Sequence, residues 1–107
     1  MIFILPHCFY FLLLKIVLSS DASNSEALYY TGISHQELHE DHEAIPFFEK
    51  VMKQSRNAFC SGAKWHLSKA YMNTNQLSKA KKLLQELSAG TSEYKANASA
   101  LLDSLSK

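Results

Sequence analysis

The stretch AIPFFEKV at residues 44–51 has a counterpart thirty-six residues later, AKKLLQEL at residues 80–87. The same offset aligns three further pairs, which are Tyr29 with Trp65, Gly32 with Ser68, and His35 with Tyr71. Two copies of one pattern at a fixed period of this size are typical of stacked helices, in which each unit buries its apolar face against the next. The sequence therefore predicts an all-α fold built from helix pairs.

The apolar residues around both copies recur every three to four positions, which is the spacing of one face of an α-helix. They predict helices over about residues 25–38, 42–55, 58–73 and 76–88, and a last helix that is capped by Thr91 or Ser92 and runs to about residue 105. The side chains expected to face inward are Leu28, Gly32, His35, Leu38, Ala44, Ile45, Phe48, Val51, Met52, Phe59, Ala63, Leu67, Ala70, Tyr71, Leu77, Ala80, Leu83, Leu84, Leu87, Tyr94, Ala98, Leu101, Leu102 and Leu105.

Several residues have preferences that fit the ends of these helices. Ser23 and Glu26 match a capping box, S-x-x-E, which satisfies free N–H groups at a helix start. Asn75 suits a left-handed turn residue or a helix cap, and Gly90 suits the C-terminal end of a helix. Gly32 lies inside a predicted helix, where it costs about 1 kcal/mol relative to Ala. We therefore expect another helix to approach closely at Gly32.

The apolar segment MIFILPHCFYFLLLKIVL at residues 1–18 has three open interpretations. It resembles an export signal or membrane anchor followed by small residues, but Pro6, His7 and Lys15 interrupt it and no basic residue precedes the run. It also fits the second helix of a preceding, truncated repeat, because residues 21–27 read as a connector. The third interpretation is a flexible tail. We therefore treat residues 1–20 separately from the repeat domain at 21–107.

The overall composition excludes several classes of function. The formal net charge is +1, with 11 basic and 10 acidic residues mixed along the chain, which is unlike a nucleic-acid-binding protein. The two cysteines, Cys8 and Cys60, lack metal-binding or redox spacing and are expected to be free thiols. No nucleophile–base pattern, phosphate-binding loop or paired carboxylates occur, so the sequence predicts neither enzymatic activity nor a cofactor.

A polar cluster at residues 35–43 contains three histidines. His35 and His39 are four residues apart and share a helix face, and His42 could supply a third zinc ligand. The cluster does not match H-E-x-x-H. The alternative interpretation is a hydrophilic turn in which His35 packs in an aromatic position, and the sequence favours this alternative.

Together, these residues resemble the tetratricopeptide repeat family. The second copy supplies the bulky, small and apolar positions of that pattern, which are Trp65, Leu67, Ser68, Tyr71, Ala80, Leu84 and Leu87. The first copy supplies Leu28, Gly32, Ala44, Phe48 and Val51, and departs from the pattern at Thr31 and His35. The resemblance covers about residues 21–88, with residues 91–105 as a terminal capping helix. It implies antiparallel helix pairs stacked as a short right-handed superhelix of five to six helices.

The resemblance also implies a function, which is the binding of a peptide or partner segment in a concave groove. The groove residues that it implies are Tyr29, Tyr30, Ile33, Gln36, Glu37, Trp65, His66, Lys69, Met72 and Asn73. A clamp for a terminal carboxylate is not expected, because Ile33 and Glu37 replace two of its residues. A weaker resemblance, to repeat regions that follow a membrane helix in bacterial envelope proteins, implies a structural or membrane-tethered spacer. Membrane contact through residues 1–18, self-association, and a cytoplasmic or periplasmic location are left open.

Overall fold

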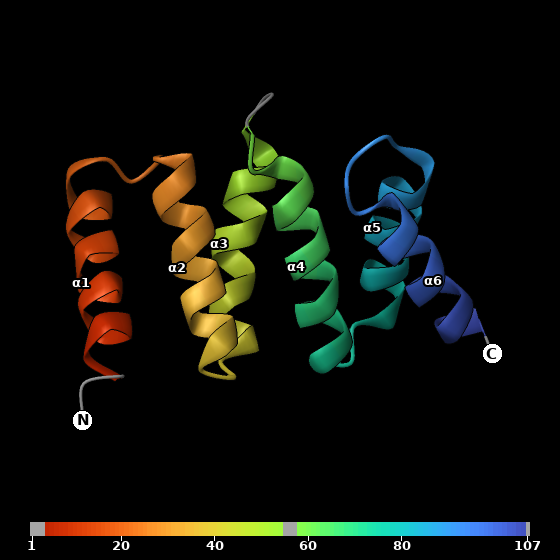
Figure 1. Ribbon diagram of the computed structural model, residues 1–107, viewed down its shortest axis with the longest axis horizontal. Coiled ribbons are helices and arrows are strands. Elements are labelled where there is room, and N and C mark those ends of the chain that lie inside the picture. The colour runs from red at the N-terminus through yellow and green to blue at the C-terminus, as the bar shows by residue number, and fades with distance from the viewer. Residues whose placement is uncertain (1–3, 55–57, 107) are drawn as a thin grey trace.

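The computed structural model describes the backbone of residues 4–54 and 58–106 and the side chains of 12–54 and 58–105. This part of the chain folds into six helices joined by short connections, and consecutive helices run in opposite directions (Figure 1). The helices are α1 (Ile4–Ser20), α2 (Ser25–Glu37), α3 (Asp41–Lys53), α4 (Cys60–Asn73), α5 (Leu77–Ala89) and α6 (Lys95–Ser106). Each packs against its neighbours in chain order, giving a body of 41 × 33 × 22 Å. The predicted all-α stack of helix pairs is confirmed.

The thirty-six-residue period is also present in the backbone. His39 and Asn75 are equivalent under this offset, and both have a φ of 62°. The next residues, Glu40 and Gln76, precede α3 and α5 with nearly the same angles, φ −105° and ψ 64° against φ −106° and ψ 61°. The turn within each helix pair is therefore the same structure, and the left-handed conformation predicted for Asn75 is confirmed.

The core consists of two hydrophobic clusters, one extending from α2 to α5 and the other between α5 and α6. Its fully buried side chains include Leu28, Phe48, Val51, Leu67 and Leu84. Two residues that were expected inside are exposed, since Leu38 is 48% and Leu77 46% accessible. Leu38 follows the last residue of α2, and Leu77 is the first residue of α5. Both residues are exposed because they lie where the chain leaves or enters a turn.

The close approach predicted at Gly32 is present between α2 and α3. A Cβ atom at this position would lie 2.7 Å from Cε1 of Phe48, which is closer than carbon atoms pack. Gly62 has the same role between α4 and α2, because a Cβ atom there would lie 2.5 Å from the Tyr29 hydroxyl. No pattern in the sequence distinguishes Gly62 in this way. Both glycines allow a large aromatic ring to fill the space between helices.

The helix ends agree only in part with the sequence signals. The capping box at Ser23 and Glu26 is wrong: the N-cap of α2 is Asn24, whose Oδ1 accepts from the Ala27 N–H at 2.9 Å. Ser23 instead donates through its hydroxyl to Asp21, at 2.9 Å. Gly90 ends α5 as predicted, in an extended conformation. The last helix begins later than expected, at Lys95. Ser92 Oγ precedes it and accepts from the backbone N–H of Tyr94 at 3.3 Å.

The N-terminal segment forms α1, which packs on α2 (Figure 1). Leu14 is buried in this contact, at 6% exposure. Within the described residues, no helix has both the length and the apolar character needed to cross a membrane. The residues of α1 nearest the connector thus pack on the array as a further helix.

Candidate functional site

The ten predicted groove residues are divided equally between α2 and α4, and their exposure differs widely. Tyr29 is buried, at 8% exposure. Six residues are half-buried, namely Tyr30, Ile33, Gln36, Trp65, His66 and Met72. Three are exposed, namely Glu37, Lys69 and Asn73. The surface available to a partner therefore comes from nine of the ten residues, and Tyr29 contributes mainly to packing.

Four of these residues line one hollow between α4 and α6. The hollow has a volume of about 370 Å³ and is lined by Trp65, Lys69, Met72, Asn73 and Leu101. Three of the side chains are apolar, and Lys69 and Asn73 supply an ammonium and a carboxamide group. Leu101 comes from α6 and was predicted only as a core residue. The hollow can accept an apolar side chain with a polar or anionic group beside it.

The indole ring of Trp65 is held in place from two directions. Its ring stacks on Tyr94, with centroids 5.8 Å apart and an interplanar angle of 20°. Lys69 Nζ lies 5.5 Å from the centroid of the Trp65 ring, which is within the range of a cation–π contact. Because Trp65 already has these neighbours, its ring is positioned before any partner arrives. The sequence pattern predicted Tyr94 as an inward-facing residue of the last helix, but not as the residue on which Trp65 stacks.

Gln36 and His66 join α2 to α4. Gln36 Nε2 donates to the backbone carbonyl of His66 at 2.9 Å, and Gln36 Oε1 lies 3.1 Å from His66 Nδ1. With its amide nitrogen donating, the Gln36 oxygen must accept, so His66 Nδ1 carries a proton in this contact. Burial, together with the nearby charge of Lys69, lowers the pKa of His66 to about 4. His66 therefore acts as a neutral junction between the two helices.

Tyr29 lies at the centre of an aromatic cluster between α2 and α4. Its ring centroid is 5.1 Å from those of Tyr30 and Phe59, 5.8 Å from that of His66 and 6.2 Å from that of Phe48. Burial is the main reason that the pKa of the Tyr29 hydroxyl is raised above its usual value. This cluster fixes the spacing of α2 and α4, and so the width of the surface that they present.

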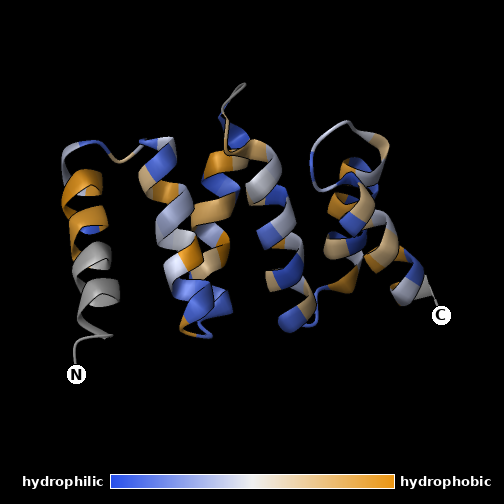
Figure 2. Cartoon of the chain, in the orientation of Figure 1, coloured by the Kyte–Doolittle hydropathy of each residue, from blue (hydrophilic) through white to orange (hydrophobic). Residues whose placement is uncertain are grey.

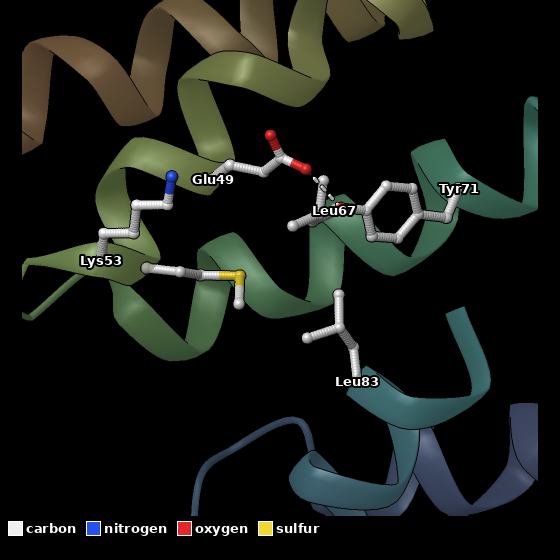
Figure 3. Close-up of a pocket in the computed structure, with 6 residues that line it drawn as sticks. Glu49, Lys53, Leu67, Tyr71 and Leu83 are labelled. Carbon is white, nitrogen blue, oxygen red and sulfur yellow. Dashed lines mark hydrogen bonds between the residues drawn. The ribbon is translucent and has the colours of Figure 1, made fainter. Parts of the chain in front are cut away.

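A second recess, lined by α3, α4 and α5, contains none of the predicted groove residues. Its volume is about 320 Å³, and its lining is Glu49, Met52, Lys53, Leu67, Tyr71 and Leu83 (Figure 3). The Tyr71 hydroxyl donates to Glu49 Oε2 at 2.5 Å, and burial followed by this contact raises the pKa of Tyr71. Lys79 Nζ lies 5.5 Å from the centre of the Tyr71 ring. The Tyr71 hydroxyl and the Glu49 carboxylate at this recess are thus paired with each other.

The histidine cluster has structural contacts. His35 Nδ1 lies 2.8 Å from Glu40 Oε1, and the His35 ring stacks on Phe47 at 5.4 Å and 19°. The aromatic packing position predicted for His35 is therefore present. Among the side chains that the structure describes, no three histidine, cysteine or acidic residues are grouped so that they could hold a metal ion. Cys60 is a free thiol, as predicted, whereas Cys8 lies outside the described side chains.

Comparison with known proteins identifies the repeat. The model of the tetratricopeptide repeat family matches residues 42–105, from α3 through α6, which is more than half of the chain. The match begins later than the resemblance at residues 21–88 suggested and includes the terminal helix. Comparison with curated proteins and with solved structures gives no significant match. On the evidence of the family match and the repeated helix pairs, the chain belongs to the tetratricopeptide repeat family.

Proposed function

We propose that the chain binds a peptide segment of a protein partner along the surface of α2, α4 and α6. The observation that carries this proposal is the hollow of about 370 Å³ between α4 and α6, since four of its five lining residues are predicted groove residues. Tetratricopeptide repeat domains are in general protein-interaction modules and typically have no catalytic role. The proposal applies this general role to a defined surface.

The chemistry of the hollow favours a segment with one large apolar side chain. Trp65, Met72 and Leu101 offer apolar contact area, and the Trp65 ring is already fixed by Tyr94. A ring that is held in place loses little rotational freedom when a partner binds, so more of the contact energy contributes to affinity. Lys69 is exposed beside the Trp65 ring and favours an acidic or carbonyl group next to the apolar side chain.

The α2 half of the surface extends this site. Tyr30 and Ile33 are half-buried, and Glu37 is exposed. Tyr29 and His66 stabilise the packing of α2 against α4, through the aromatic cluster and the hydrogen bonds with Gln36. We assign direct contact to the exposed and half-buried residues other than His66, and a supporting role to Tyr29 and His66.

Trp65 is the only tryptophan in the chain, so its fluorescence reports directly on the hollow. Peptides selected from a random library against the whole chain should change the Trp65 emission as they bind. Substitution of Met72 by Glu places a charge in the apolar lining and should weaken binding at least tenfold, about 1.4 kcal/mol. Lys69→Glu, at an exposed position, should weaken the binding of acidic peptides in particular.

Lys53→Glu is the matched control, because Lys53 lines the other recess and is also exposed. It should leave affinity unchanged, and far-ultraviolet circular dichroism should show that all three variants keep their helices. The groove assignment is wrong if the selected peptides bind without changing Trp65 emission, or if they bind Met72→Glu as tightly as the unmodified chain.

A further inference from the structure

The exposed side of α1 carries a stripe of aliphatic side chains. Leu12, Leu13, Ile16 and Val17 are 56%, 43%, 61% and 39% accessible. Leu13 and Val17 also line a hollow against the start of α2, together with the buried Leu14. The pairs Leu12–Ile16 and Leu13–Val17 are each four residues apart, so all four residues lie on one broad face of the helix. We refer to these four residues as the α1 stripe. Figure 2 shows this part of α1 in nearly continuous apolar colour, whereas the other helices alternate.

Within the array, α3 packs between α2 and α4, and α5 packs between α4 and α6. The main helix contact of α1 among the described residues is with α2 alone. Each inner helix is covered by two neighbouring helices, whereas α1 is covered mainly by α2. Within the described part of the chain, the α1 stripe therefore lacks the second neighbour that an inner helix has. An exposed group of large apolar side chains marks an interaction surface more often than isolated ones do.

The α6 end of the molecule differs in chemistry. Polar and charged residues are exposed on α6, namely Lys95, Asn97, Ser99, Asp103 and Ser104. A second copy that docked its α6 on the α1 stripe would bury these groups without partners, which is unfavourable. Head-to-tail growth of the array is therefore disfavoured. Of the two ends of the described array, the end whose chemistry matches the α1 stripe is the α1 end of another copy.

A lipid surface matches the region less well. Lys15 is the only lysine or arginine in α1, and the neighbouring connector and α2 expose Asp21 and Glu26. Helices that lie on membranes usually carry several basic residues on their polar side, which attract anionic lipids. Leu14, beside the stripe, is buried and lines a hollow with Ala27 of α2, so this side of α1 is not a basic face. These features favour a protein neighbour.

We propose that the α1 stripe pairs with the α1 stripe of a second copy about a two-fold axis. Such a contact is closed, since each copy uses the same surface. Four side chains on one helix form a small contact, below the usual interface size of about 1,600 Å². The dimer should therefore be weak, with a dissociation constant of about 1 µM or higher.

Sedimentation equilibrium of the full chain over a wide concentration range tests the proposal. The unmodified chain should change from monomer to dimer as its concentration rises to about 1 mM. Ile16→Glu and Ile16→Lys should each remain monomeric, because like charges would meet at the axis. An equimolar mixture of these two variants should regain the dimer, since opposite charges then face each other. Ala100→Glu, on the exposed side of α6, should dimerise like the unmodified chain.

Three results would overturn the proposal. The first is an unmodified chain that stays monomeric throughout the range. The second is a dimer that persists in both Ile16 variants. The third is a monomer that sediments with vesicles of phosphatidylcholine and phosphatidylglycerol through the same residues, which would assign the stripe to lipid. Because Ile16 is mostly exposed, circular dichroism should show the same helix content in every variant.

Discussion

The two helix pairs fill the equivalent space between their helices with different residues. In the first pair, Gly32 of α2 lies against the fully buried ring of Phe48 in α3. In the second pair, the equivalent residues are Ser68 and Leu84, both also fully buried. A larger side chain on one helix is thus matched by a smaller one on its neighbour. What the repeat preserves is the volume between the helices, rather than the identity of either residue.

The largest effect should come from replacing Gly32 of the first pair by serine, which is the residue at the equivalent position, Ser68, in the second pair. Gly32→Ser adds a Cβ atom 2.7 Å from the Phe48 ring. The Phe48 ring is fully buried, so it can shift only by displacing other core side chains. We therefore expect a loss of about 2–3 kcal/mol in the free energy of unfolding, despite the better helix propensity of serine. Urea denaturation followed by circular dichroism measures this loss.

Adding Phe48→Leu to Gly32→Ser recreates the combination of the second pair, and should recover most of the lost stability. The reverse change, Leu84→Phe against Ser68, should destabilise by a similar amount, because the second pair then has both larger residues. The comparison fails if the double substitution is no more stable than Gly32→Ser alone, since the two positions would then be independent.

A second difference concerns His66, which aligns with Tyr30 of the first pair. The pKa of His66 is about 4 in the folded protein, below the ordinary value of 6.5. As pH falls, His66 therefore takes up a proton in the unfolded chain before it does so in the folded protein. The free energy of unfolding should be constant above about pH 6.5 and should fall between about pH 6.5 and 4. Because the ring is partly exposed, we expect a loss of about 1–2 kcal/mol.

The matched variant is His66→Phe, which retains a ring but cannot titrate. Its stability should depend less on pH over the same range. An equal pH dependence in the two proteins would show that another group is responsible. The unfolding midpoints in urea between pH 4 and pH 7 decide this point.

The sequence predicted the repeat, the helix pairs and Gly32 because these depend on periodicity and on residue size along one chain. The family resemblance placed both Tyr29 and the equivalent Trp65 in the groove, but Tyr29 is buried and Trp65 is half-buried. The two differ in the structure because Gly62 leaves room for the Tyr29 ring, whereas Trp65 stacks on Tyr94. Contacts between residues far apart in the chain are not visible in a local pattern. For the same reason, the sequence could not predict that Leu101 lines the hollow between α4 and α6.

A smaller effect should come from the equivalent turn residues His39 and Asn75, which share a φ of 62°. Asparagine adopts this left-handed conformation more readily than most residues, and glycine adopts it without steric cost. His39→Gly should therefore stabilise the protein by about 0.5–1 kcal/mol, and Asn75→Gly by less. Thermal unfolding of both variants provides the comparison, and a larger gain at Asn75 would contradict it.

The smallest effect should come from Thr31, which occupies the position of Leu67 in the second pair. Thr31 is almost fully buried, and its hydroxyl oxygen has no hydrogen-bond partner among the described residues. Thr31→Val keeps the shape of the side chain and removes a polar atom that is not paired. The free energy of unfolding should stay within about 0.5 kcal/mol or rise slightly. A loss above about 1 kcal/mol, the usual net contribution of one hydrogen bond, would instead show that the hydroxyl is bonded in solution. The first pair would then hold a polar contact at the position where the second pair buries Leu67.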